Sequence, residues 1–477
     1  MMLRYALAAS LAVSFTAHAQ AAAPPKGRCQ FQFDNTPNTT LTTLQLPSKQ
    51  YNSFLGNGVV ARCPSQKILL KSDSLESYGD EGRFFFIGHV DYKEPRLSLK
   101  ADFLTYFQRD ERLLAFSNVD ATLPSGSQLK GSSLEFWRAI PKVRPKQHAV
   151  SIGRPTITII EKDPQGKPQP PVTVTGNTVW MEGDSVVAAS GEVVVVRPEL
   201  TATGDSLYLD NGSGFLRLMR KPKMVGTKGR PFTLVGETLD LMSRQKKLNR
   251  VLSKTGAEAT SEDLNLKSDT IDMRVTDDLL QRATAWGKGR AHAMSPQQNI
   301  IADSIDVIMP KQRVREMHAV RGAVAEGSPD TAKVHASPDQ KDRLMGDTII
   351  AYFDSIPAGD TTSKPRIKKL IAIGHASSLQ HLPPRDTSLR KPDINYVCGK
   401  QITVTFDSAK VSDVKVEASD PPCGGMYLEA VADSVARRAP PGTTPPTTPA
   451  GTPPAGGTPP RSPAPTPTTP AIPAKRP

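Results

Sequence analysis

The stretch LKADFLTY, residues 99 to 106, decides the fold, because its pattern occurs ten times between residues 70 and 404. The pattern is an apolar residue, any residue, a small residue, an anchor that is most often acidic or amide, any residue and a second apolar residue. Most anchors lie roughly 30 residues apart, a spacing typical of stacked repeats. The anchors are Asp73, Asp102, Ser132, Asn177, Asp205, Glu237, Asp269, Asp303, Asp347 and Lys400.

The pattern contains a change of face. Side chains alternate between the two faces of a strand, so the apolar residue three before the anchor and the small residue one before it share a face. The apolar residues two and four after the anchor have the opposite parity. A strand that keeps its apolar side inward therefore needs a bulge or a sharp bend at the anchor, which a small residue followed by Asp, Asn or Ser tolerates. Each anchor is predicted to be a corner where a long strand passes from one wall of a folded sheet to the other.

A second corner follows in most repeats, after a run of alternating apolar residues. The second corners are predicted at Gly88-His89-Val90, Ser117-Asn118-Val119, Gly191-Glu192-Val193, Gly289-Arg290-Ala291, Gly322-Ala323-Val324 and Gly374-His375-Ala376. Two bent strands per repeat predict an all-β fold of about twenty bent antiparallel strands, stacked into one elongated jelly roll.

Apolar residues that follow the corners are predicted to point inward. They are Leu75, Leu104, Tyr106, Leu134, Phe136, Val179, Met181, Leu207, Leu209, Leu239, Leu241, Ile271, Met273, Ile305, Val307, Ile349 and Ile402. In a closed core these rows would only hold the fold together. In an open groove they would also line a path for lipid, because each buried CH₂ group is worth about 0.8 kcal/mol.

Repeats that read small-Asp-x-apolar-x-Tyr, a loop and then Leu-x-Ala-x-Gly-Asn-Val are similar to the LptA/OstA-like family of periplasmic lipopolysaccharide-transport proteins. The resemblance covers about residues 65 to 418. It implies a V-shaped twisted jelly roll (a β-taco) whose apolar groove carries lipopolysaccharide, or a related anionic lipid, toward the outer membrane. It also implies pairing with other transport components through strand edges. The long insertions, with Ser132 and Lys400 at anchors, depart from the family pattern.

The ends of the chain have a different composition from the repeats. Residues 1 to 19 have the basic, apolar and small-residue segments of a secretory signal, which predicts a periplasmic protein. The resemblance implies association with the outer membrane. Residues 20–64 are expected to form an N-terminal segment and cap. Residues 419–438 are expected to form a C-terminal cap, in which 428 to 438 have the apolar spacing of a short helix. The Pro/Thr-rich residues 439–477 predict an extended, disordered spacer.

Four cysteines flank the repeats, with Cys29 and Cys63 before them and Cys398 and Cys423 at their end. An even number in an exported chain favours disulfides, and pairing by proximity would staple each end of the stack. Free buried thiols are the alternative. No Cys and His spacing here is typical of a zinc site.

The formal net charge of +13 favours anionic partners such as phosphorylated lipid, whereas nucleic acid is not expected for an exported protein. The alternative is that lysines such as Lys71, Lys100, Lys130 and Lys267 only solvate an outer strand face. The three basic or Pro-rich insertions, 138 to 172, 326 to 343 and 380 to 393, are expected to be surface excursions. Within the first of them, 156 to 160 is expected to form a short hairpin arm.

The chain shows one enzyme-like tetrapeptide, Gly204-Asp205-Ser206-Leu207, which matches a lipase and esterase motif with Ser206 as nucleophile. The partner motif Asp-x-x-His is absent, and the tetrapeptide is the fifth repeat in register. His89 and His375 are interpreted as turn residues. We therefore expect no catalytic activity, no cofactor and no metal. The two functions left open are a lipid-transport protein and a structural or interaction β-solenoid with a closed core and a Pro-rich tether.

Overall fold

The computed structural model describes residues 29 to 430, except 35–37, 161–164, 297, 330–336, 338, 355–364, 387–390 and 408–409. The predicted signal, the C-terminal spacer and residues 431 to 438 of the predicted helix lie outside this part of the chain. The described residues belong to one compact unit.

This unit is a single antiparallel sheet of thirty strands with two short 3₁₀ turns, η1 (Pro64–Gln66) and η2 (Pro310–Gln312), and no α-helix among the described residues. The strands are β1 (Gln32–Phe33), β2 (Thr40–Gln45), β3 (Tyr51–Gly56), β4 (Val59–Cys63), β5 (Ile68–Ser72), β6 (Ser74–Tyr78), β7 (Arg83–Glu94), β8 (Leu97–Phe107), β9 (Arg112–Thr122), β10 (Gln128–Trp137), β11 (His148–Ile152), β12 (Thr156–Ile159), β13 (Val172–Thr175), β14 (Thr178–Glu182), β15 (Val186–Arg197), β16 (Leu200–Asp210), β17 (Phe215–Met219), β18 (Lys223–Gly226), β19 (Phe232–Val235), β20 (Thr238–Arg244), β21 (Lys247–Ser261), β22 (Asn265–Thr276), β23 (Leu279–Met294), β24 (Gln298–Ile308), β25 (Glu316–Gly327), β26 (Asp342–Phe353), β27 (Ile367–Leu382), β28 (Asp393–Asp407), β29 (Lys410–Glu417) and β30 (Met426–Leu428). The all-β prediction is confirmed.

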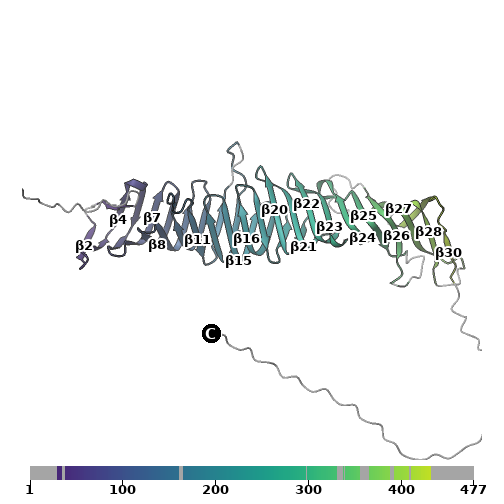
Figure 1. The fold of residues 1–477 in the computed structure, drawn as a ribbon, viewed down its shortest axis with the longest axis horizontal. Coiled ribbons are helices and arrows are strands. Elements are labelled where there is room, and N and C mark those ends of the chain that lie inside the picture. The colour runs from purple at the N-terminus through teal and green to yellow at the C-terminus, as the bar shows by residue number, and fades with distance from the viewer. Residues whose placement is uncertain are drawn as a thin grey trace, which may run out of the picture. The chain divides into compact units, whose positions relative to one another are not determined.

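Between β3 and β28 the strands form a meander of bent strands that follow one another along the stack (Figure 1). Six pairs, such as β5 with β6 and β13 with β14, are the two halves of one bent strand, and fourteen strands run through the bend. The described chain therefore has twenty bent strands in this meander. The stack begins at Tyr51, earlier than the expected residue 65.

Both kinds of corner shift the register of the strand pairs, as the sequence predicts. Pairing between β7 and β8 shifts between Ile87 and Val90, and pairing between β8 and β9 shifts between Lys100 and Phe103. At the second corner the backbone enters the left-handed region, with φ of +74° at Gly374 and +45° at His375. A surplus residue on one strand is accommodated there by this turn.

The anchor side chain holds the second corner of the next strand. The Oδ2 atom of Asp347 lies 2.9 Å from Nδ1 of His375, and Oδ2 of Asp102 accepts a hydrogen bond of 2.6 Å from the Asn118 amide. These bonds join the anchor to side chains of the turn, and at Asp269 the anchor carboxylate also accepts a hydrogen bond of 3.0 Å from the backbone N–H of Gly289, which the bulge removes from the strand ladder. They also explain why most anchors are acidic or amide residues, and they place His375 at a turn, as predicted.

Some second corners differ from the predicted positions. The left-handed pair of β25 is Arg321 and Gly322, one residue earlier than predicted. In β23 the anchor Asp269 contacts Gly287, so the bulge begins two residues before Gly289. The sequence pattern did not predict three left-handed pairs, Gly153-Arg154, Arg220-Lys221 and Thr255-Gly256. The pair Arg220-Lys221 contains no glycine, and the other two pairs do not follow an apolar run of the usual form.

Two further expectations are wrong. Within the region 138 to 172, residues 148 to 159 do not leave the stack, because β11 and β12 form a bent strand that pairs with β10 on one side and with β13 and β14 on the other. Leu428 is not the start of a helix, because β30 pairs with Ile394 to Tyr396 of β28. In both places the ladder hydrogen bonds of a neighbouring strand decide the conformation, and they do not appear in the local sequence.

The two predicted disulfides, Cys29–Cys63 and Cys398–Cys423, are formed, so the alternative of free thiols is wrong. No helix among the described residues is long and apolar enough to cross a membrane.

Candidate functional site

The candidate site is the interior of the folded sheet. Because each of the twenty bent strands of the meander bends near its middle, the sheet has two walls that are joined along the corners, and hairpin turns lie along the two free edges. We call the space between these two rows of turns the mouth. Turns 94–97, 226–232 and 261–265 belong to one wall, and turns 107–112, 276–279 and 308–316 belong to the other.

The inward faces of the two walls form an almost continuous apolar core. One group of buried residues extends from Cys29 to Ala149 and a second from Ile157 to Val404, and Met181 contacts both groups. All seventeen residues that the sequence predicts to point inward are buried, except Met181, which is partly buried. Many of the residues around them are alanine, so each layer fits large side chains against small ones.

Side chains fill most of this interior. Three hollows among the described residues have cavity volumes of about 20, 10 and 70 Å³. The first, beside Met181, lies at the junction of the two buried groups. The largest lies under the mouth, beside Phe232, Met273 and Met309. The interior is therefore a packed core in this structure, and the largest of these three hollows lies near the mouth.

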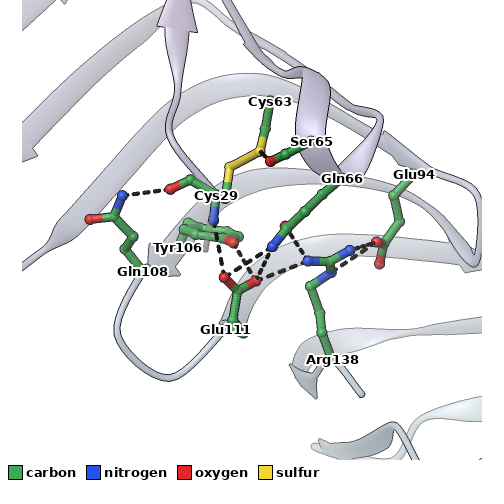
Figure 2. Close-up of a disulfide and its surroundings, with 9 residues drawn as sticks. All are labelled: Cys29, Cys63, Ser65, Gln66, Glu94, Tyr106, Gln108, Glu111 and Arg138. Atoms are coloured by element: carbon green, nitrogen blue, oxygen red, sulfur yellow. Dashed lines mark hydrogen bonds and ion pairs between the residues drawn. A yellow bond between two sulfur atoms is a disulfide. The ribbon is translucent and has the colours of Figure 1, made fainter. Parts of the chain in front are cut away.

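A buried polar cluster closes the mouth over the first repeats (Figure 2). The Glu111 carboxylate accepts hydrogen bonds from the Cys29 backbone N–H at 3.2 Å, the Tyr106 hydroxyl at 2.8 Å, Nε2 of Gln66 at 3.1 Å and Nη1 of Arg138 at 2.9 Å. Gln66 comes from one wall, whereas Tyr106, Glu111 and Arg138 come from the other. The disulfide between Cys29 and Cys63 holds the N-terminal segment in this position.

Arg138 carries the charge of this cluster. Its Nη2 lies 2.6 Å from Glu94 Oε2, and the side chains of Arg138, Glu94 and Glu111 are 17%, 3% and 7% exposed. Burial alone would lower the pKa of Arg138, but the charge of Glu94 raises it above its ordinary value, so the guanidinium stays protonated. Burial, followed by the charge of Glu111, raises the pKa of Tyr106, which stays neutral. One cation thus joins two carboxylates from opposite walls.

Phe31 fills the space below this cluster. Its ring centroid lies 5.0 Å from those of Phe84 and Tyr106 and 5.9 Å from that of Phe86. Edge-to-face contacts of this kind add to the stabilisation from burial. The segment that begins at Cys29 therefore acts as a stapled plug at the N-terminal end of the interior.

A second set of contacts crosses the mouth in the middle of the stack. Nζ of Lys228 lies 2.6 Å from Asp278 Oδ2, the Arg230 N–H donates to Oε1 of Gln312 at 2.7 Å, and Nε2 of Gln312 donates to the Lys228 carbonyl at 3.1 Å. We call these four residues the clasp. Neither crossing could be predicted from the sequence, because neither has a periodic signal.

The other candidate groups lie on the outside of the walls. Lys71, Lys100, Lys130 and Lys267 are exposed, and Lys130 and Lys267 form ion pairs with Asp120 at 3.4 Å and with Glu258 at 3.1 Å. Ser206 lies in β16 opposite Ser190 and Met219, and the Asp205 carboxylate pairs with Arg220 at 2.9 Å. The described part of the chain contains no group of three His, Cys, Asp or Glu residues that could hold a metal ion.

Comparison of the chain with models of known protein families finds no match, and comparison with curated proteins finds none either.

Proposed function

We propose that this protein is a periplasmic lipid carrier of the LptA/OstA-like kind, whose interior takes up the acyl chains of lipopolysaccharide or a related anionic lipid. The observation that carries the proposal is the apolar interior, repeated layer after layer from Leu55 to Val404 between two walls. Similar layers give an acyl chain similar surroundings at each step, so that it meets no deep trap. Each CH₂ that leaves water contributes about 0.8 kcal/mol.

Three further observations support this function. The bent antiparallel strands agree with the V-shaped jelly roll that the sequence resemblance implies. The two disulfides are typical of an oxidising compartment outside the cytoplasm. The stack also ends in exposed strands, β2 and β29, that pair only with β3 and β28 in the described residues. Free strand edges suit the addition of strands from other transport components.

Uptake requires the walls to separate at the mouth. The walls are covalently continuous at the corners, whereas across the interior they are held by apolar contacts and by the polar groups of the mouth. Apolar contacts are not directional, so an acyl chain can replace the contacts that it displaces. The interior then opens as the mouth widens, while the corner hydrogen bonds stay intact.

The second candidate function is a structural β-solenoid with a closed core. The observation that favours it is the packing of the interior, where residues such as Leu239, Ile271 and Ile305 have no exposed surface. Such a protein would bind partners through its ends and outer faces and would take up no lipid.

Site-specific photo-crosslinking in cells separates the two functions. A photoreactive residue at Leu207, which points inward and is 2% exposed, is expected to capture lipopolysaccharide. The matched control is Tyr208, the next residue of the same strand, which points outward and is 40% exposed. Equal capture at both positions, or none at Leu207 and at a second inward position, Ile271, would leave the closed solenoid as the better account.

A further inference from the structure

We propose that the interior has a side gate in its mouth, at the turn 226–232, which opens to admit one hydrocarbon chain of a lipid. This inference rests on the proposed function and concerns the route by which a chain enters. The gate consists of the largest hollow of the interior, two apolar side chains that divide this hollow from the next, and the clasp that crosses above them.

The hollow has the chemistry of an alkyl-chain site. Its volume is about 70 Å³, and its floor is formed by apolar side chains that include Leu266, Met273, Leu280 and Met309. A space of this volume holds several water molecules, and the apolar floor favours their replacement by a hydrocarbon chain. The polar groups that border it, among them Arg230 and Gln312, lie at the mouth. An alkyl chain with its polar head left at the mouth matches this distribution.

A second hollow continues the first along the stack. Both hollows are lined by Leu264 and Val314, which come from opposite walls, and the second is also lined by Phe353. Leu264, Val314 and Phe353 are only partly buried, unlike the residues of the rows below them. Rotation of Leu264 and Val314 away from each other would join the two hollows into one slot along the mouth.

The clasp controls access to this slot. The side chains of Lys228 and Asp278 are 51% and 33% exposed, so water competes with their ion pair and the pair opens readily. Gln312 is held by two hydrogen bonds to the backbone of the opposite turn. Its amide packs against Gly229, where φ is +73° and where a Cβ atom would lie 2.9 Å from Gln312 Cδ. The turn therefore accepts Gln312 only because residue 229 has no side chain.

The mouth is closed by different contacts in its middle and in its N-terminal part. Over the first repeats the mouth is closed by a disulfide and a buried charge cluster, which do not open readily. In the middle it is closed by a half-exposed ion pair and two hydrogen bonds, above the largest hollow. Of these two closures, the clasp is therefore the easier one for a chain to open.

The test measures the uptake of a fatty acid with a terminal pyrene by the full chain, using stopped-flow fluorescence. Gln312→Ala removes both hydrogen bonds of the clasp, and we expect it to raise the association rate constant at least threefold. Gly229→Ala, which displaces the Gln312 amide, should have the same effect. A Lys228→Cys, Asp278→Cys double variant joined by a short bifunctional thiol reagent should take up the probe at least tenfold more slowly than the same variant before cross-linking.

The control is a second cross-link in the mouth, between Arg197→Cys and Lys246→Cys, two positions that also lie on opposite walls. It should slow uptake much less than the cross-link at the clasp. Unchanged rates in Gln312→Ala, or equal slowing by both cross-links, would overturn the gate while binding of the probe by the wild-type chain upholds an accessible interior. Absence of any binding by the wild-type chain would overturn the gate together with the proposed function.

Discussion

The contact between anchor and second corner predicts that two glycine substitutions with the same backbone strain differ in cost. Gly374 and Gly256 both have left-handed backbones, with φ of +74° and +64°. A Cβ on Gly256 would meet no atom within 4 Å, whereas a Cβ on Gly374 would lie 3.0 Å from Asp347 Cγ and closer still to its Oδ2. Only the second substitution therefore disturbs an anchor.

The magnitudes follow from these two terms. Alanine in the left-handed region costs about 1–2 kcal/mol, and this is the whole expected cost of Gly256→Ala. Gly374→Ala adds an overpacking term of about 1–3 kcal/mol, because Asp347 must move away and lose its hydrogen bond to His375. The total expected for Gly374→Ala is about 2–5 kcal/mol.

Native-state hydrogen exchange is the assay, because a long stack of repeats does not unfold in two states and a single midpoint would mix several transitions. The free energy of opening is measured at the amides of β26 and β27 for Gly374→Ala, and at those of β21 and β22 for Gly256→Ala. In the double variant Gly374→Ala, Asp347→Ala the carboxylate is absent, so its cost should be smaller than the sum of the two single costs by about 0.5–3 kcal/mol.

Equal costs for the two glycine variants, together with additive costs in the double variant, would refute the view that the anchor side chain holds the corner. The repeat motif would then indicate only where the backbone bends, and the anchor side chain would not stabilise the corner.

Three further predictions concern the ends and the outer face. Cys29→Ser removes a disulfide that closes a loop with a sequence separation of 34, and the chain-entropy model gives this disulfide a stabilisation of about 4 kcal/mol. Hydrogen exchange should become faster in β1 to β6 but not beyond β20, and uniform acceleration would contradict a stack of nearest-neighbour repeats. Arg138→Met leaves two buried carboxylates without their cation and should cost about 3–5 kcal/mol in the free energy of opening of β7 to β10, and a cost below 1 kcal/mol would show that the cluster is not a seal. Burial alone would raise the pKa of Asp240, but Arg217 and Lys254 lower this pKa below its ordinary value. The ionised carboxylate therefore contributes its full share to the stability of the fold above the ordinary pKa, and this contribution is lost as the pH falls through the lowered pKa of the folded state. Unfolding in urea, monitored by hydrogen exchange at the amides of β20, should show this loss of stability at acid pH in the wild type and not in Asp240→Asn.

Local patterns in the sequence were sufficient to predict the two walls of the bent sheet. The change of face at Asp102, with the small residue before it, specifies a bend within one strand, and alternation on each side places Leu99, Leu104 and Tyr106 inward. The spacing of such motifs specifies how many bends the chain makes, and the position of the cysteines at the two ends favours pairing within each end. These features depend on residues that are close in the sequence or on an even count of thiols.

Local patterns were insufficient where a neighbour supplies the hydrogen bonds. The segment 148 to 159 is rich in basic residues and proline at its borders, yet it forms a bent strand because β10 and β14 offer it free ladder groups. Leu428 has helical apolar spacing, yet it pairs with Ile394 of β28. In each case the free energy of pairing outweighs the local preference.

The sequence by itself determined that this chain bends, stacks and turns an apolar face inward at each layer. Only the tertiary structure decided how the mouth closes, where Gln312 reaches the turn at Lys228 across a separation of 84 residues and Glu111 reaches Cys29 across 82. The physical reason is that alternation and glycine placement act on the backbone within one strand. Contacts across the mouth form between turns whose proximity exists only after both walls have folded.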